Sequence, residues 1–294
     1  MTSLVLPARS PFLFRSVVFS HGWMQLLPFV FDEAAPTLRY IDRLASGRIL
    51  EYRMAESAQG VTVEVGGKLG KAERGEIADK VIWMFGLQMD FSEFYALARR
   101  EPKLAQAEAK AQGRLLRSPT LFEDVVKTIL TTNTLWSATR RMTANLVNQF
   151  GEPLPSDSTR HAFPTPNRLA AATPEQLRLE TRLGYRAPYI HELAVHLASG
   201  ELDLEVLKIS ALPTPDLRKL LMKIKGIGPY ASANLLMILG RYDFLTIDSW
   251  ALKMVSHEWH DGGPVSPIDV EKRFEKWGKW KGLAYWFWDW SYKG

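Results

Sequence analysis

The sequence predicts an α+β protein, in which a small N-terminal antiparallel β-sheet precedes a mostly α-helical body. The first 70 residues or so contain short runs of β-branched and aromatic residues divided by glycine turns, which is typical of strands. From Ser118 onward, apolar residues recur at helical spacing behind cap residues and prolines. We therefore expect a β-sheet domain with a linker helix over residues 1–112 and a helical body over residues 113–294.

In the N-terminal part, the runs FRSVVFS, LLPFVF, ILEYRM and GVTVEV are the expected strands. Alternation of apolar and polar residues in VTVEV predicts a strand with one exposed face. We expect helices near Ala35–Ala45 and in the charged, alanine-rich segment from Ala72 to Gly113.

The helical body has clear start signals. Ser118 followed by Pro119 predicts a helix start, and Thr173 with Gln176 forms a capping box. Thr214–Pro215 opens another helix, and a further one is expected from Pro229 to about Leu239.

Composition limits the class of protein. At 294 residues and 46% hydrophobic, the chain can bury a substantial core, and its net charge of +5 favours an anionic partner. The lack of cysteine excludes disulfides, iron–sulfur clusters and thiol nucleophiles. Pro7 and Arg9 interrupt the apolar N-terminus, so neither a signal peptide nor a membrane span is expected. The expected location is the cytoplasm, in association with the nucleoid, or the nucleus.

A glycine turn, Lys223-Ile-Lys225-Gly226-Ile-Gly228, separates two of the predicted helices. Glycine lets the backbone approach another molecule closely, and the N-terminus of the next helix suits a phosphate. Lys223 and Lys225 add positive charge beside it. A tight helix–helix turn without a ligand is the alternative interpretation.

Asp248 follows one loop later. The helix from Pro229 is roughly 16 Å long at 1.5 Å per residue. The return to Asp248 can span up to about 26 Å, so the carboxylate can come back to the glycine turn. Asp248 is also expected to be the N-cap of the helix that carries Trp250, and the two roles are compatible.

Together these motifs resemble the helix-hairpin-helix plus Gly/Pro–Asp (HhH-GPD) signature of the DNA glycosylase superfamily, over about Ser118 to Tyr292. The segment FPTPNRLAA is similar to the 3-methyladenine DNA glycosylase II branch, whereas RLGYRAPYI is closer to 8-oxoguanine DNA glycosylases. The N-terminal sheet is similar to the small β-domain of both branches.

This resemblance implies roles for individual residues. Asp248 is the catalytic carboxylate, which stabilises the cation-like sugar that the departing base leaves behind. Tyr230 occupies the position where bifunctional members carry a Schiff-base lysine, so no lyase activity is expected. Tyr230 would face the flipped base, although packing against a neighbouring helix is an equal alternative.

The resemblance also implies residues that contact DNA. Asn133 aligns with the residue that fills the gap left by the flipped nucleotide, and Leu135 is an apolar wedge beside it. Tyr185 and Arg186 match a second wedge and a contact to the unpaired opposite base; the alternative is an exposed turn after Gly184.

The C-terminal segment WGKWKGLAYWFWDW most often completes a core, yet in the related family it also lines the base pocket. Trp280, Trp286 or Trp290 would then form a stacking wall. No cofactor is expected, and no transition metal is assigned to His257 and its neighbours. The resemblance allows a monovalent cation on the carbonyls of the hairpin.

The leading hypothesis is a monofunctional DNA glycosylase of base excision repair that acts, as a monomer, on alkylated purines in double-stranded DNA. One alternative is a glycosylase for 8-oxoguanine or deaminated bases. Others are a non-catalytic helix-hairpin-helix DNA-binding protein and a structural partner whose basic surface is incidental.

Overall fold

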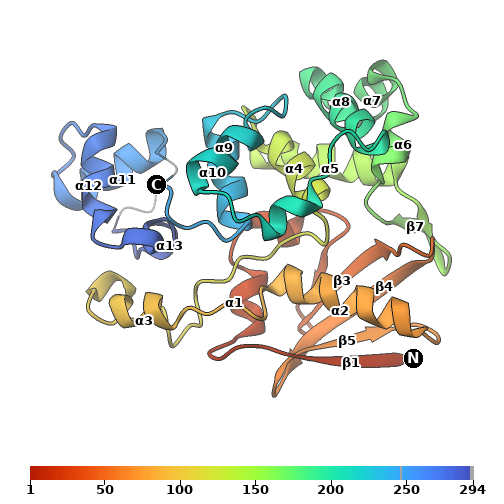
Figure 1. Cartoon of the computed structure of the whole chain (residues 1–294), viewed down its shortest axis with the longest axis horizontal. Helices are drawn as coiled ribbons and strands as arrows, with labels where there is room; N and C mark the ends of the chain where they lie inside the picture. Colours follow the sequence, from red (N-terminus) through yellow and green to blue (C-terminus); the bar gives the residue numbers. More distant parts are fainter. Residues whose placement is uncertain (246, 292–294) are drawn as a thin grey trace. The chain divides into compact units, whose positions relative to one another are not determined.

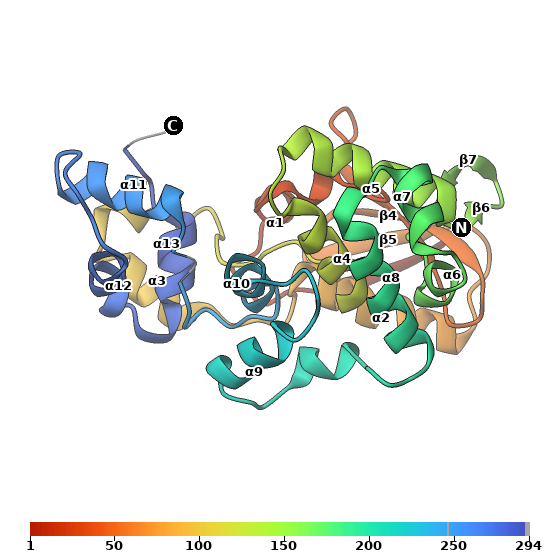
Figure 2. The same cartoon turned by 90° about the horizontal axis from the view of Figure 1, so that it is seen from above.

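The computed structural model describes residues 1–245 and 247–291 and divides into two compact units. Unit 1 comprises Met1–Met89, Arg114–Ser210 and Ile224–Gly226, and unit 2 comprises Asp90–Gly113, Ala211–Lys223 and the described part of Ile227–Gly294. Figures 1 and 2 show the elements of both units. The domain division expected from the sequence, at residue 113, stays a prediction.

Unit 1 contains the predicted N-terminal antiparallel sheet, in the order β1-β5-β4-β3-β2. Its strands are β1 (Thr2–Pro7), β2 (Val30–Asp32), β3 (Thr37–Arg43), β4 (Ile49–Ser57) and β5 (Gly60–Val65). The alternation predicted in VTVEV is confirmed, because Val61, Val63 and Val65 are buried while Glu64 is exposed.

Two predictions for the N-terminal part were wrong. The helix expected near Ala35–Ala45 is strand β3, in which Tyr40 lies opposite Tyr52 of β4, so pairing with a distant segment decided its conformation. The run FRSVVFS is not a strand but contains the short helix α1 (Phe14–Val18). Its buried residues Phe14, Val17 and Val18 have the spacing of a helix face.

Helix α2 (Lys71–Phe85) covers the inner face of this sheet (Figures 1 and 2). The buried Asp42 of β3 ties the two together, since it accepts hydrogen bonds from Tyr52 Oη at 2.5 Å and from Lys80 Nζ of α2 at 2.6 Å. The helix expected from Ala72 to Gly113 is interrupted, because Gly86 takes a left-handed conformation that ends α2.

The remainder of unit 1 is mainly helical. One predicted start shifts: α4 is capped by Thr120 rather than Ser118, since the Thr120 hydroxyl accepts the hydrogen bond from the N–H of Glu123. The predicted capping box of Thr173 and Gln176 is confirmed. The elements are η1 (Gly22–Gln25), α4 (Leu121–Thr131), α5 (Trp136–Phe150), β6 (Pro153–Leu154), β7 (Asp157–His161), α6 (Pro166–Ala170), α7 (Pro174–Thr181), η3 (Gly184–Arg186), α8 (Ala187–Ala198) and η4 (Glu205–Ile209).

Unit 2 is helical in its described part and has an aromatic core. Phe274 lies at its centre, with the rings of Trp259, Tyr285, Trp288 and Trp290 at centroid distances of 5.4–6.1 Å. In the described chain no helix has both the length and the apolarity needed to cross a bilayer. The elements are α3 (Ser92–Ala98), η2 (Pro102–Leu104), α9 (Thr214–Leu221), α10 (Pro229–Ile238), α11 (Ser249–Trp259), α12 (Pro267–Glu275), η5 (Gly278–Trp280) and α13 (Lys281–Phe287).

A buried polar cluster connects α4 to the sheet of unit 1. Lys127 Nζ lies 2.6 Å from Glu123 Oε1, and Tyr40 Oη donates to Glu123 Oε2 at 2.5 Å. The neighbouring Asp124 accepts from Trp23 Nε1 at 2.7 Å, and burial raises the pKa of its carboxyl group to about 6. Folding therefore shifts the equilibrium of Asp124 toward its uncharged form, compared with the unfolded chain.

We expect Asp124→Asn to remove a pH-dependent loss of stability. Because the pKa of Asp124 is raised on folding, its contribution is present below pH 4 and is lost as the pH rises through about 6. Relative to wild type, the free energy of unfolding of the variant should rise by about 2–3 kcal/mol between pH 4 and pH 8. Urea unfolding at a series of pH values measures this difference.

The burial of His21 lowers its pKa to about 4, but wild type and variant share this residue, so its titration cancels in the comparison. A difference in stability that is the same at every pH would contradict the assignment to Asp124.

Candidate functional site

The predicted hairpin joins α9 to α10. Gly226 has φ = +90°, and a Cβ there would lie 3.0 Å from Tyr189 Cδ2 and 3.4 Å from Ile129 Cγ2. Gly228 has an ordinary φ of −94°, faces open space and is the N-cap of α10. The first glycine is thus required by the chain itself, whereas the second leaves room for another molecule beside the helix N-terminus.

The lysines of the hairpin are exposed. Lys223 has no salt bridge within residues 1–245 and 247–291, and Lys225 Nζ lies 2.6 Å from Glu192 Oε2. An exposed pair of this kind contributes little energy, so both cations can turn to an anion.

Asp248 is half-buried and caps α11, as its sequence position predicts. Its Oδ1 accepts a hydrogen bond from the N–H of Ala251 at 2.8 Å. The cap fixes the carboxylate in one orientation at the positive end of the helix dipole.

Tyr285 of α13 packs against Trp250, which lies two residues after Asp248, with their ring centroids 6.1 Å apart. Burial raises the pKa of the Tyr285 phenol, and the charges of Asp248 and then of Tyr230 raise it further. Tyr285 therefore keeps its proton at neutral pH. Asp248 and Tyr230, to which the sequence assigned chemistry, belong to the same unit.

Trp250 is an aromatic residue beside Asp248 to which the sequence assigned no role. It is 46% exposed, comparable with Tyr230 at 47%, in a unit whose other tryptophans are mostly buried. Tyr285 and Trp290 hold its ring edge-on at 6.1 and 5.9 Å. Its place in the first turn of α11, one residue before the buried Ala251, is the sequence signal that points to this exposure.

The other aromatic candidates lie deeper. Trp280 stacks on Tyr242 at 5.9 Å and contacts Phe91 and Phe94, so it completes the core of unit 2. Trp290 is buried and Trp286 is half-buried. Their roles in a base pocket stay predictions.

In unit 1 the two predicted DNA-contacting loops meet. Asn133 is exposed with φ = +47°, and Leu135, at the start of α5, is 77% exposed. Tyr185 is 49% exposed, and its hydroxyl donates to the carbonyl of Thr132 at 3.4 Å. A polar and two apolar side chains thus project from one place.

Arg186 holds these loops together. It is only 6% exposed, and its guanidinium donates to the carbonyl of Thr132 and, at 3.4 Å, to that of Asn133. It also lies 4.4 Å from the ring centroid of Tyr185. The structure therefore uses Arg186 to brace the loop, and its predicted contact to an opposite base stays a prediction.

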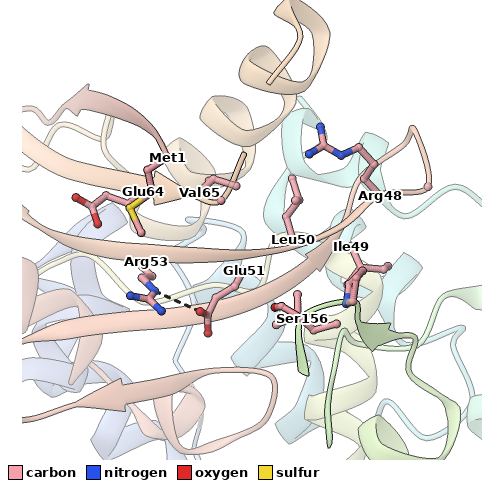
Figure 3. Close-up of a pocket in the computed structure, with 13 residues that line it drawn as sticks. Met1, Arg48, Ile49, Leu50, Glu51, Arg53, Glu64, Val65 and Ser156 are labelled. Atoms are coloured by element: carbon pink, nitrogen blue, oxygen red, sulfur yellow. Dashed lines mark hydrogen bonds and ion pairs between the residues drawn. The ribbon is translucent and has the colours of Figure 1, made fainter. Parts of the chain in front are cut away.

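A pocket of about 580 Å³ lies elsewhere in unit 1, where the outer face of β4 and β5 meets the β6–β7 turn (Figure 3). Its arginines are paired, Arg53 with Glu51 and Arg48 with Glu73, and no predicted site residue lines it. Within the described chain, His, Asp and Glu side chains form no group of three or more that could hold a metal. The carbonyl site for a monovalent cation stays a prediction.

Comparison with known proteins shows which family the chain resembles. A family model described as "HhH-GPD superfamily base excision DNA repair protein" matches residues 126–279. The chain is 30% identical over 167 residues to a DNA-3-methyladenine glycosylase of Bacillus subtilis (strain 168), an alignment that covers 56% of this chain and 54% of that protein. The chain thus spans about half the length of this curated relative.

Solved structures agree on the fold. A 3-methyladenine DNA-glycosylase from Archaeoglobus fulgidus has a TM-score of 0.75 at 22% identity, with 98% of this chain and 97% of that chain covered. The apo-form of the Clostridium acetobutylicum 8-oxoguanine glycosylase/lyase has a TM-score of 0.71 at 21% identity, with 94% and 91% covered. The predicted fold class is confirmed.

The two hairpin glycines should respond differently to alanine. Gly226→Ala forces a left-handed alanine against Tyr189 and is expected to lower the free energy of unfolding by about 2 kcal/mol. Gly228→Ala is the matched control, with a cost of about 0.5 kcal/mol for a poorer N-cap. Urea unfolding of both variants tests this, and equal losses would refute the distinction.

Proposed function

The chain belongs to the HhH-GPD superfamily of base excision DNA repair proteins, and we propose that it is a monofunctional DNA glycosylase that hydrolyses the N-glycosidic bond of alkylated purines such as 3-methyladenine. The observation that carries the proposal is the fixed placement of the Asp248 carboxylate at the N-cap of α11, where the half-exposed Trp250 packs edge-on against Tyr285. The same unit holds the exposed Tyr230, in the first turn of the helix that follows the hairpin.

Glycosylases act on a base that has been rotated out of the duplex. An alkylated purine of the 3-methyladenine type carries positive charge, and an electron-rich aromatic face attracts it. Tyr230 and Trp250, both about half exposed, supply such faces, and neither adds a cation that would repel the base. The name of the Bacillus subtilis relative supports the same substrate class.

Bond cleavage leaves a cation-like sugar. The Asp248 carboxylate, held by its cap bond to Ala251, stabilises that charge without having to reorganise. A positively charged base is a good leaving group and needs little help from an acid.

Tyr230 also argues against a lyase step. A phenol cannot form an imine with the sugar, so hydrolysis through water is the expected route at this position. The partner is duplex DNA with one damaged base, bound by a monomer in the cytoplasm or the nucleus.

The second candidate is a glycosylase for 8-oxoguanine. It is favoured by the packing of Tyr185 and Arg186 against the Asn133 loop, in the segment that resembles that branch. Duplexes that carry single lesions separate the two, because alkali reveals abasic sites only where a base has been removed.

Asp248→Asn should abolish turnover while leaving duplex affinity near normal. The amide oxygen can still cap Ala251, so the fold is kept, but the charge that stabilises the sugar is lost. We expect a fall of at least about 10²-fold in the single-turnover rate on a 3-methyladenine duplex. Asp261→Asn, at an exposed position with φ = +48° that asparagine tolerates, is the control for loss of one charge. Equal rates for Asp248→Asn and wild type would remove Asp248 from the mechanism.

Borohydride should trap no covalent protein–DNA adduct during the reaction. Tyr230 stands where an amine would be needed, so no imine is available for reduction. A glycosylase that has a catalytic lysine serves as the positive control on the same duplex. Gel electrophoresis reads the result, and a strong adduct would contradict the monofunctional assignment.

A further inference from the structure

Helix α5 presents two arginines on its outer face. Its inner face packs into unit 1, which leaves Arg140 and Arg141 exposed. Arg141 precedes Asn145 by one turn, so their side chains lie on the same edge of the helix. The inner-face residues are Thr139, Met142, Thr143, Leu146 and Val147.

The edge of α5 that carries Arg141 faces the end of α7. Asn145 Nδ2 donates to the carbonyl of Thr181, the last residue of α7, at 3.2 Å. Arg182 comes next, exposed and in a left-handed conformation with φ = +60°. Figure 2 shows α5 and α7 side by side. Arg141 and Arg182 therefore stand at the adjoining edges of the two helices, and we call this pair the α5–α7 cationic strip.

The strip continues into the exposed loops. Arg141 is six residues, about 9 Å along the helix, from the exposed Leu135. On the α7 side, Arg186 contacts Met142 Sδ at 4.0 Å and braces the loop of Asn133. The two cations Arg141 and Arg182 thus lie on the helices that adjoin the loops of Asn133, Leu135 and Tyr185.

Four exposed arginines of unit 1 lie within 4.0 Å of a carboxylate: Arg15 with Glu33, Arg48 with Glu73, Arg53 with Glu51 and Arg178 with Glu175. Arg141 and Arg182 differ from these four, because they have no salt bridge within the described residues. Unpaired guanidinium groups suit phosphate, which they bind with two parallel N–H donors.

We propose that the α5–α7 cationic strip binds phosphates of duplex DNA next to the segment that Asn133, Leu135 and Tyr185 enter. The inference rests on the proposed function. It adds a contact between arginine side chains and the DNA phosphates to the contact that the hairpin amides of the protein would make. B-DNA carries one negative charge per about 1.7 Å of axis, so neighbouring phosphates are within reach of both arginines.

The test is the salt dependence of binding to an undamaged duplex, measured by fluorescence anisotropy. The slope of log K against log salt concentration is negative, and each lost phosphate contact reduces its magnitude by about 0.9. Arg141→Gln/Arg182→Gln should therefore reduce the magnitude of the slope by about 2. The control, Lys68→Gln/Lys71→Gln, removes the same charge from exposed positions outside the strip and should leave the slope as in wild type. Arg141→Lys/Arg182→Lys keeps the charges and should retain most of the slope.

A slope that is unchanged in Arg141→Gln/Arg182→Gln, or that falls equally in the lysine control, overturns the strip. Weaker binding with an unchanged slope overturns it as well, because lost phosphate contacts must release fewer ions. Failure of the wild-type protein to bind duplex DNA at all would instead count against the proposed function. Melting temperatures of the variants confirm that they are folded.

Discussion

The cap bond from Ala251 N–H to Asp248 Oδ1 is the interaction on which the candidate site depends. The first turn of a helix has N–H groups without intrahelical partners, and an aspartate at the N-cap satisfies one of them. In α11 this local requirement also fixes the place of the carboxylate, two residues before the half-exposed Trp250. Folding of the helix and preparation of the site are therefore one event, and no separate scaffold is needed to orient the acid.

The two glycines of the hairpin have different structural roles. Gly226 is present because the backbone turns left-handed against Ile129 and Tyr189, so its reason lies inside the fold. Gly228 has neither constraint, and its open surroundings lie at the N-terminus of α10. The two glycines of the G-x-G pattern are thus required for two different reasons. The first glycine positions the hairpin, and the second leaves its amides accessible to a ligand.

Local signals predicted what local chemistry decides: the Thr173 capping box, the helix from Pro229 and the cap by Asp248 were all confirmed. Non-local packing decided the rest. Residues 37–43 form a strand because they pair with β4, which no short window of sequence reveals. Composition also cannot tell which aromatic residues stay exposed. Trp280 stacks on Tyr242 in the core, while Trp250, to which the sequence assigned no role, remains half exposed two residues after Asp248.

Arg186 was singled out from the sequence, but the hydrogen bonds that its side chain makes could not be predicted from it. Its side chain is buried and bound to the carbonyls of Thr132 and Asn133, so an approach to a base would have to give up these bonds. Breaking the charge-assisted hydrogen bonds of a buried guanidinium is costly unless new partners replace them. Any contact of Arg186 with DNA is therefore coupled to the conformation of the loop that carries Asn133. Arg186 and this loop would therefore respond to DNA as one unit, whereas phosphate binding by the exposed cations Arg141 and Arg182 would leave these bonds intact.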